Sequence, residues 1–387
     1  MTNKLNKVII LGTAHPFRGG LAAYNERLAK AFSDRGINTE IVTFTTQYPS
    51  FLFPGKTQFT DQPSPIGYKI TRLLSSINPF SWIKTGFYIR KQKPDLIITK
   101  YWLPFMGPAF GTVAAIAGFR RETIRLSILD NVIPHEHRPG DKFFTKYFIH
   151  FTDAFIAMSD SVLHDLKTFT KRKPALFNPH PLYDHYGNPK SKEDACKIIG
   201  VDPNFNYLLF FGFIRDYKGL DILLDAMAMV GPKKPKLKLI VAGEFYNNSE
   251  PYLQQIKNLQ IDDYIVLKTD FISDDKVADY FSAADVIVQP YKTATQSGVT
   301  QIAYHFEKPM IVTNVGGLPE IVPHMKTGLV SEPSSKAIAS AINTFYDLPS
   351  NYFEKGLAEE KKKYSWDRML DSILSIILQL NKSKNEQ

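Results

Sequence analysis

Short apolar runs alternate along the chain with longer stretches in which apolar residues recur every three or four positions. The short runs match strands of a parallel sheet, which are buried on both faces, and the longer stretches match amphipathic helices. The predicted strands cover residues 7–11, 40–44, 96–99, 124–129, 154–157, 207–211, 237–242, 265–267, 286–288 and 310–313. Strands that alternate with helices in this way are typical of doubly wound α/β domains.

The chain divides near its middle into two similar halves. Its 387 residues suggest about two domains. Residues 178–181, Asn-Pro-His-Pro, cannot form a helix or a central strand, because each proline lacks an N–H and restricts the residue before it. We therefore predict Rossmann-like domains over residues 1–178 and 179–365, followed by a strongly amphipathic helix over 366–381.

The composition is that of a globular protein with a basic surface. Hydrophobic residues make up 44% of the chain and charged residues 22%, which is ordinary for a domain with a core. The net charge of +9 predicts anionic partners, such as phosphates or acidic lipid headgroups, and the absence of a Lys/Arg tract argues against nucleic acid. The single cysteine, Cys196, excludes an intrachain disulfide and fits the cytoplasm. Residues 8–11 are too few for the apolar part of a signal peptide.

The uncharged segment Trp102–Phe119 is long enough to be weighed as a membrane span. Pro104 and Pro108 interrupt its first third, and glycine and alanine dominate the remainder. We therefore predict a buried helix that faces a parallel sheet.

The segment Pro79–Lys93 combines aromatic and basic residues at helical spacing, and two interpretations are open. A basic amphipathic helix of this kind binds an anionic membrane, which would make the protein peripheral at the inner face of a membrane. Alternatively, the helix packs its apolar face inward and leaves its charged face in solvent. We favour the second interpretation.

A strand–loop–helix unit in the second half is the strongest candidate for a ligand site. The strand Val286–Val288 precedes the polar loop Thr293–Gly298 and a helix predicted over Val299–Phe306. Such a unit aims unpaired N–H groups above the sheet, and the helix dipole favours an anion there. Gly298 lies at the turn from loop to helix, where we expect a φ angle that only glycine adopts cheaply. After the next strand, Gly317 allows the backbone to approach a ligand closely.

The loop at residues 212–219, GFIRDYKG, also follows a predicted strand. Arg215 can grip a phosphate with two hydrogen bonds, whereas Lys218 acts as a point charge. The alternative is that both are ordinary cations of a surface loop. The strand after this loop ends in Gly243 and Glu244.

The first half of the chain offers weaker candidates for residues that contact a ligand. Gly19 and Gly20 open a helix after the first strand, where they form either a tight turn or a close approach to a ligand. His135 lies in a loop after the strand at residues 124–129 and is a candidate for contacting a substrate. Although His135 and His137 flank Glu136, no further group of ligands completes a metal site, so we expect no metal.

Taken in this order, the motifs resemble the donor-binding signature of retaining nucleotide-sugar glycosyltransferases of family 4, which have the GT-B fold. That fold consists of two doubly wound Rossmann-like domains that face each other across a cleft. Family members carry roughly G-R-x-x-x-x-K-G after the first strand of the second domain. Lys218 and Gly219 match this motif directly. Phe213 occupies the usual arginine position, and Arg215 is its expected substitute.

One feature departs from the family pattern. Family members have two glutamates eight positions apart, one near the sugar and one near the ribose. An alignment without gaps places Ala294 and Ile302 at these positions, so the chain resembles a variant that lacks both glutamates. Hydrogen bonds from the loop sequence TQSGVTQ are the expected replacement. Their sources are the side chains of Gln296, Ser297, Thr300 and Gln301 and the backbone N–H groups of Gly298 and Val299.

The resemblance implies transfer of a sugar from a nucleotide-sugar donor to a glycan or lipid-linked acceptor, with retention at the anomeric carbon and without a metal or other cofactor. It assigns residues 1–178 to acceptor binding, with the helix at 366–381 crossing back to them, and residues 179–365 to donor binding. The predicted catalytic residues are Arg215, Lys218 and His135. The predicted donor-binding residues are Gly19, Gly20, Gly212, Glu244, Gln296, Ser297, Gly298, Val299, Thr300 and Gly317.

Two other functions fit the same fold. A sugar-nucleotide epimerase would need acid and base carboxylates that converge in the cleft, and the sequence shows no such cluster. A non-catalytic sugar-nucleotide-binding protein would account for the missing glutamates.

Overall fold

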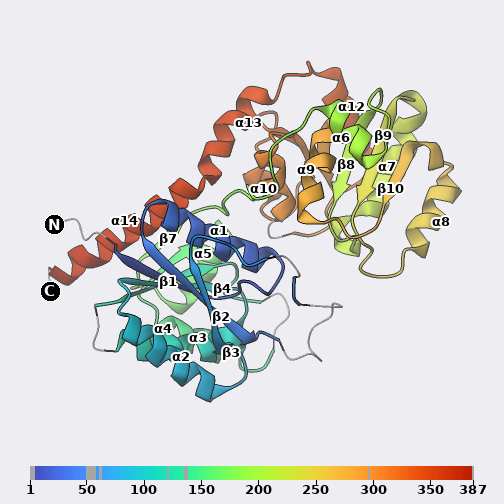
Figure 1. Cartoon of the computed structure of the whole chain (residues 1–387). Coiled ribbons are helices and arrows are strands. Elements are labelled where there is room, and N and C mark those ends of the chain that lie inside the picture. The colour runs from blue at the N-terminus through green and yellow to red at the C-terminus, as the bar shows by residue number, and fades with distance from the viewer. Residues whose placement is uncertain are drawn as a thin grey trace. The chain divides into compact units, whose positions relative to one another are not determined.

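The structure is a computed structural model, and it describes residues 5–48, 58–60, 63–119, 122–134, 138–294 and 297–385. The chain forms two compact units (Figure 1). Unit 1 contains Met1–His180 together with Trp366–Gln387, and unit 2 contains Pro181–Ser365. Each unit is built on one parallel sheet, so the predicted doubly wound α/β architecture is confirmed.

Among the described residues, unit 1 has a seven-stranded parallel sheet with the first strand in its middle. In spatial order the strands are β3 (Lys69–Ser75), β2 (Asn38–Thr46), β1 (Lys7–Leu11), β4 (Leu96–Tyr101), β5 (Ile124–Leu129), β6 (Ala154–Ala157) and β7 (Ala175–Phe177). The chain winds outward from β1 to β3 and then returns to β4 to wind in the other direction. The switch point of this sheet therefore lies between β1 and β4.

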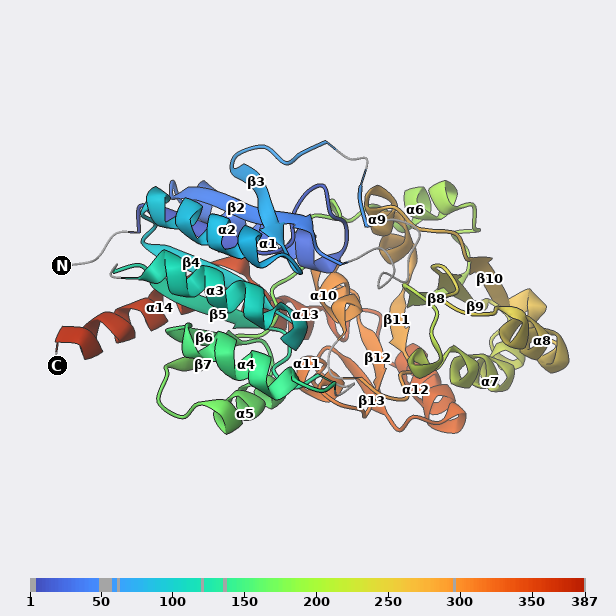
Figure 2. The same cartoon turned by 90° about the horizontal axis from the view of Figure 1, so that it is seen from below.

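Alternate side chains of these strands point to opposite faces of the sheet. Val8 and Ile10 pack against α1 (Gly20–Asp34) and the C-terminal helix α14 (Trp366–Asn385). Ile9 belongs to a second cluster that includes the helices of the other face. These helices are α2 (Pro79–Gln92), α3 (Gly107–Gly118), α4 (Asp141–His150) and α5 (Asp160–Phe169) (Figure 2).

The segment Trp102–Phe119 forms a 3₁₀ turn at Pro104–Met106 and then α3, most of which is buried. A Cβ on Gly107 would lie 2.5 Å from the carbonyl oxygen of Phe144, so glycine allows α3 to pack closely on α4. The prediction of a buried helix against a parallel sheet is confirmed. No helix in the described part of the chain is long and apolar enough to cross a membrane.

Helix α2 turns three large apolar side chains outward. Its buried residues are the small or medium-sized Thr85, Gly86 and Ile89. A Cβ on Gly86 would lie 2.7 Å from the Cβ of Ile116 in α3, so the small residue sets the close approach of the two helices. The outward-facing apolar residues are Phe80, Ile83 and Phe87. The favoured prediction, that the apolar face of this helix packs inward, is therefore wrong for these three side chains.

Unit 2 has, within its described residues, a six-stranded parallel sheet whose switch point lies between β8 and β11. In spatial order the strands are β10 (Ile265–Lys268), β9 (Leu237–Ala242), β8 (Asn206–Phe211), β11 (Val286–Gln289), β12 (Met310–Thr313) and β13 (Gly328–Ser331). The α-helices are α6 (Lys192–Ile199), α7 (Leu220–Val230), α8 (Glu250–Leu259), α9 (Asp274–Ala283), α10 (Gly298–His305), α11 (Leu318–Ile321), α12 (Ser335–Asp347) and α13 (Glu354–Lys361). Further 3₁₀ turns lie at Asp216–Lys218, Gly231–Lys233, Asp262–Tyr264 and Lys362–Tyr364.

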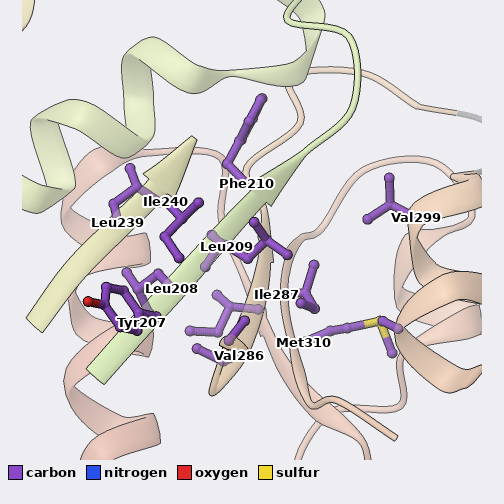
Figure 3. Packing of buried hydrophobic residues seen from close by; sticks show 14 of the residues in the cluster. Tyr207, Leu208, Leu209, Phe210, Leu239, Ile240, Val286, Ile287, Val299 and Met310 are labelled. Carbon is purple, nitrogen blue, oxygen red and sulfur yellow. The ribbon is translucent and has the colours of Figure 1, made fainter. Parts of the chain in front are cut away.

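The central strands of this sheet form the core of unit 2. Leu208, Ile240 and Ile287 have no solvent-exposed surface, and Val299 at the start of α10 joins the same apolar cluster (Figure 3). Because apolar side chains fill the middle of the unit, its polar chemistry is concentrated in the loops at the ends of the strands.

Candidate functional site

The candidate site lies at the carboxyl edge of the unit 2 sheet. Strands β9, β8, β11 and β12 are neighbours, so the loops that follow them lie side by side at this edge. The loops after β8 and β11 leave the sheet at its switch point, which is where open α/β sheets bind ligands. Every site residue predicted in the second half of the chain follows one of these four strands.

The loop between β8 and α7 is held by both of its neighbours. On one side, the N–H of Ile214 donates to the carbonyl of Glu244, after β9, at 2.8 Å. On the other side, a Cβ on Gly219 would lie 2.0 Å from the carbonyl oxygen of Pro290, after β11. Gly219 also has a φ of +70°, so its conformation favours glycine and this close approach requires it.

Lys292 neutralises the acidic side chains near this loop. Its ammonium group lies 2.8 Å from the carboxylate of Asp216 and 3.0 Å from that of Asp221. Its backbone N–H donates to the carbonyl of Tyr217 at 2.7 Å. The two carboxylates therefore form ion pairs with Lys292 and are not counter-ions for the other cations of the loop.

Arg215 and Lys218 form a cationic pair in the same loop. The guanidinium carbon of Arg215 lies 3.8 Å from the ring centre of Tyr246, and the ammonium of Lys218 lies 5.9 Å from that of Tyr291. Neither cation forms an ion pair with a residue that the structure describes. Burial of Lys218 and the nearby charge of Arg215 lower the pKa of the lysine to about 8. A bound anion would oppose both effects by stabilising the charged lysine, so the pair is a candidate anion site.

Helix α10 begins at the same edge of the sheet. Ser297 is its N-cap, and the Ser297 hydroxyl accepts the N–H of Val299 at 3.2 Å. Thr300 is buried, and its hydroxyl donates to the carbonyl of Ser297 at 2.6 Å. The N–H of Gly298 has no acceptor among the described residues. An unused donor at a helix N-terminus, together with the helix dipole, favours an anion.

Gly298 is the first residue of α10, and its φ is not positive. The expectation that only glycine can adopt its backbone conformation is therefore wrong. The restriction is one of space, because a Cβ on Gly298 would lie 3.3 Å from Cε2 of Tyr183. No sequence motif identified Tyr183, and its one signal is its place in an aromatic group with His185 and Tyr186.

Two glycines bring the ends of β8 and β9 together. Gly212 and Gly243 have φ values of +91° and +129°, and a Cβ on Gly243 would lie 2.5 Å from the carbonyl oxygen of Gly212. A Cβ on Gly212 would lie 3.1 Å from the ammonium nitrogen of Lys218, so Gly212 borders the cationic pair. Glu244 follows this junction and is partly buried.

The remaining predicted residues are placed as follows. Gly317 precedes the four-residue helix α11 with a φ of −85°, and its neighbour Gly316 takes a positive φ of +51°, which favours glycine. In unit 1, Gly19 is the N-cap of α1 with a φ of +105° and open space around its Cβ position, and Gly20 begins that helix. His135 and Gln296 lie outside the described residues. In the described ranges, no three His, Cys, Asp or Glu side chains group together to hold a metal ion.

Sequence analysis also missed a buried cation in unit 1. Lys100, at the end of β4, is 2% exposed, and its ammonium lies 2.8 Å from the carboxylate of Asp130 and 3.5 Å from the ring centre of Tyr24. Burial lowers the pKa of Lys100, and the Asp130 carboxylate opposes that effect. We assign the pair to joining the ends of β4 and β5, because each charge already has a partner.

The two positions aligned with the family glutamates have apolar side chains and also lie in apolar surroundings. Ile302 is 5% exposed and belongs to the core of unit 2, and Ala294 packs against the same core. A carboxylate at residue 302 would therefore be buried in an apolar cluster.

Replacing Ile302 with glutamate should destabilise the protein and leave transfer activity unimproved. Burial that raises the pKa of the glutamate by about three units costs about 4 kcal/mol of unfolding free energy at neutral pH. The folded-state pKa is raised, so this loss should shrink as the pH falls from 7 toward 4. Chemical denaturation across this pH range measures the effect, with Ile302→Met as the volume-matched control. A glutamate variant as stable as the methionine variant at pH 7 would contradict the burial argument.

Comparison with known proteins finds a matching family profile in the second half of the chain. The profile described as "Glycosyl transferases group 1" matches residues 206–347, within unit 2. A D-inositol 3-phosphate glycosyltransferase from Pseudarthrobacter chlorophenolicus is 32% identical over 174 residues, which span 44% of this chain and only 41% of that relative. An uncharacterised glycosyltransferase from Methanocaldococcus jannaschii is 25% identical over 388 aligned positions, covering 97% of this chain and 99% of that protein.

A solved structure supports the fold over the whole chain. The crystal structure of Anabaena HepE in complex with UDP is similar with a TM-score of 0.68 at 18% identity, covering 99% of this chain and 100% of that chain. The profile match, the relatives and the two Rossmann-like sheets agree with one another. Unit 2 is therefore similar to the group 1 glycosyltransferases, and the chain as a whole has the GT-B fold.

Proposed function

We propose that this glycosyltransferase transfers a sugar from a nucleoside diphosphate-sugar to a glycan or lipid-linked acceptor, with retention at the anomeric carbon. The observation that carries the proposal is the pair of Arg215 and Lys218, which has no counter-ion among the described residues. Tyr291 connects this pair to the start of α10, because its ring lies 5.9 Å from the Lys218 ammonium and its hydroxyl lies 3.2 Å from the Ser297 hydroxyl. A diphosphate is an anion of the size and charge that such a site would bind.

The reaction places negative charge where these groups lie. The bond between the anomeric carbon and the diphosphate oxygen breaks, and its electron pair remains on the diphosphate. Arg215, Lys218 and the N–H of Gly298 stabilise that charge without reorganising. The acceptor hydroxyl bonds to the same face of the sugar, and its proton passes to the leaving phosphate oxygen. This route needs no carboxylate base from the protein.

We further infer that the chain is a working variant without the two family glutamates. Ala294 and Ile302 pack in or against the core, so the hydrogen bonds to the sugar must come from other groups. Gln296, which precedes α10 in the sequence, and Glu244, which follows β9, are the polar candidates, and Tyr183 beside Gly298 supplies an aromatic ring against which a sugar can stack. Ser297 and Thr300 hold the start of the helix through their hydroxyl groups.

The missing glutamates also favour a second candidate, a sugar-nucleotide-binding protein without transfer activity. One experiment separates the two. Calorimetric titrations with UDP-, GDP- and ADP-sugars find the donor, and an assay for release of the nucleoside diphosphate then measures turnover. UDP-glucose is the first choice because HepE, which shares the fold, has been crystallised with it. Binding with turnover supports the transferase, binding without turnover supports the second candidate, and the absence of binding to every donor contradicts both.

Donor affinity should depend on pH through Lys218. Its pKa of about 8 in the free protein means that the ammonium is present below this pH and is lost above it. A sugar diphosphate does not titrate in this range, so affinity should stay constant up to pH 8 and then fall by about tenfold per pH unit. Calorimetry from pH 6 to 9.5 measures this change.

The variant Lys218→Arg is the matched control for this pH dependence. Arginine keeps its charge throughout the range, so the variant should bind donor at pH 9 as it does at pH 7. If the wild-type affinity is also unchanged at pH 9, Lys218 does not contact the diphosphate.

A further inference from the structure

Helix α2 presents an apolar stripe to solvent. Phe80, Ile83 and Phe87 are 83%, 43% and 57% exposed, and their spacing of three and four residues places them on one face of the helix. Lys84 and Lys91 are also exposed, and each lies four positions after a phenylalanine of the stripe. We call these five residues the docking face.

The fold of unit 1 does not account for the docking face. The helix lies close to its neighbour at Gly86, which faces Ile116, and its apolar contacts with the core come from Ile89 and the partly buried Trp82 and Tyr88. Two phenylalanines left in solvent on the opposite side of an otherwise well-packed helix contribute nothing to that packing. Contiguous exposed apolar side chains of this kind mark an interaction surface.

The charges around the docking face are mainly positive. From Pro79 to Lys93 the chain has four Lys or Arg residues and no Asp or Glu. The neighbouring elements on this side of the sheet extend the pattern, because α2, α3 and α4 lie next to one another (Figure 2). Phe119, after α3, is 54% exposed with the guanidinium of Arg90 at 5.5 Å, and Phe143 on α4 is 69% exposed. Lys142 and Lys146 flank Phe143 and are exposed too, whereas the acidic residues of these neighbouring segments are Asp141 and the exposed Glu122.

A partner for the docking face must offer an apolar region to the phenylalanines and anionic groups to the lysines around them. A soluble polyanion matches the lysines and leaves the phenylalanines in water, and an apolar protein groove matches only the phenylalanines. The boundary between the headgroups and the acyl chains of an anionic bilayer satisfies both.

We propose that unit 1 binds an anionic membrane surface through the docking face. Phe80, Ile83 and Phe87 enter the boundary between headgroups and acyl chains, and Lys84 and Lys91 contact lipid phosphates. The surface is a different part of the molecule from the donor site, so the proposal does not rest on the proposed function. If the membrane proposal and the proposed function are both correct, membrane binding brings the enzyme to a lipid-linked acceptor.

Co-sedimentation of the full chain with vesicles tests the proposal. The wild type should bind vesicles of phosphatidylcholine that contain phosphatidylglycerol, should bind pure phosphatidylcholine weakly, and should dissociate as salt is added. The variant Phe80→Ser/Phe87→Ser should lower the partition coefficient on the order of 100-fold, because two aromatic side chains no longer leave water. The variant Lys84→Ala/Lys91→Ala should lower it about 25-fold, because each lysine contributes about fivefold.

Matched controls come from exposed residues of unit 2. Ile198 and Tyr352 are 56% and 41% exposed, so Ile198→Ser/Tyr352→Ser removes similar apolar surface elsewhere. Lys257→Ala/Lys336→Ala makes the same change of charge at exposed positions. Both controls should bind vesicles like the wild type, and all four variants should keep the wild-type donor affinity. Equal sedimentation of the wild type with neutral and anionic vesicles at every salt concentration, or equal binding by the docking-face variants and their controls, would overturn the proposal.

Discussion

Replacing Arg215 or Lys218 with alanine should lower the turnover of sugar transfer by about 100- to 1000-fold, because each change removes a fixed cation from the charge that grows on the leaving diphosphate. The dissociation constant of the donor should rise much less, because that charge is largest in the transition state. Steady-state kinetics at saturating donor, combined with calorimetric affinities, separates the two effects. The double variant should lose less than the product of the single losses, because both cations act on one anion.

Thermal unfolding distinguishes this catalytic role from a structural one. Arg215 and Lys218 lack a counter-ion among the described residues and repel each other, so either alanine variant should unfold at the wild-type temperature or above it. Lys292→Ala is the contrasting control, because it removes the ion pairs with Asp216 and Asp221 and should lower the unfolding temperature. An Arg215 or Lys218 variant with near wild-type turnover would remove that residue from the mechanism.

The central strands could be predicted from sequence because they are buried on both faces. Strand β9 matches its predicted bounds at both ends, since all but one of its six side chains are fully buried and the apolar run is continuous. The missed strands β3, β7 and β13 all lie at the edges of their sheets. An edge strand pairs on one side only, and β3, with the sequence KITRLLS, carries Lys69 and Arg72 among its apolar residues. Its pattern is therefore too weak to be recognised without its neighbour.

The orientation of α2 could not be predicted for a different reason. Helical spacing groups Phe80, Ile83 and Phe87 on one face, but periodicity alone does not state which face meets the core. The deciding contact is between Gly86 and Ile116, which are far apart in sequence and are brought together by the packing of α2 on α3. A glycine outside the stripe was an available signal, and it has meaning only once the neighbouring helix is known.

The candidate site was predictable where it depends on one loop and not where it depends on several. The cations of the GFIRDYKG loop were identified from the position of the loop after a predicted strand and from the resemblance to the family motif. Lys292 pairs with the acidic groups near this loop, which leaves Arg215 and Lys218 without a counter-ion in the described part of the chain. This pairing depends on β8 and β11 being neighbours in the sheet, which the sequence did not show. Tyr183 approaches Gly298 from the segment that follows the unit boundary, and no local pattern could have placed it there.

Replacing Gly298 with valine should abolish measurable donor binding, which corresponds to a loss of more than about 100-fold in affinity if the N–H donor and its electrostatic contribution are both lost. The added side chain would occupy the space in front of the helix N-terminus, where we place the diphosphate. Its Cβ would also lie 3.3 Å from Tyr183, so Gly298→Ala should already weaken binding and valine should weaken it further. Calorimetric titration with the donor identified for the wild type measures the series.

The double variant Gly298→Val/Tyr183→Ala separates the two causes of this loss. Removing the tyrosine ring relieves the crowding at the Cβ of residue 298 but leaves the valine methyl groups in front of the helix. If the anion lies at this N-terminus, the double variant should still fail to bind, whereas rescue of binding would mean that valine acts only by displacing Tyr183. Overpacking against Tyr183 should cost the single variant about 1–3 kcal/mol of stability, and the double variant should recover part of it. A folded Gly298→Val protein with wild-type donor affinity would show that the diphosphate does not bind at α10.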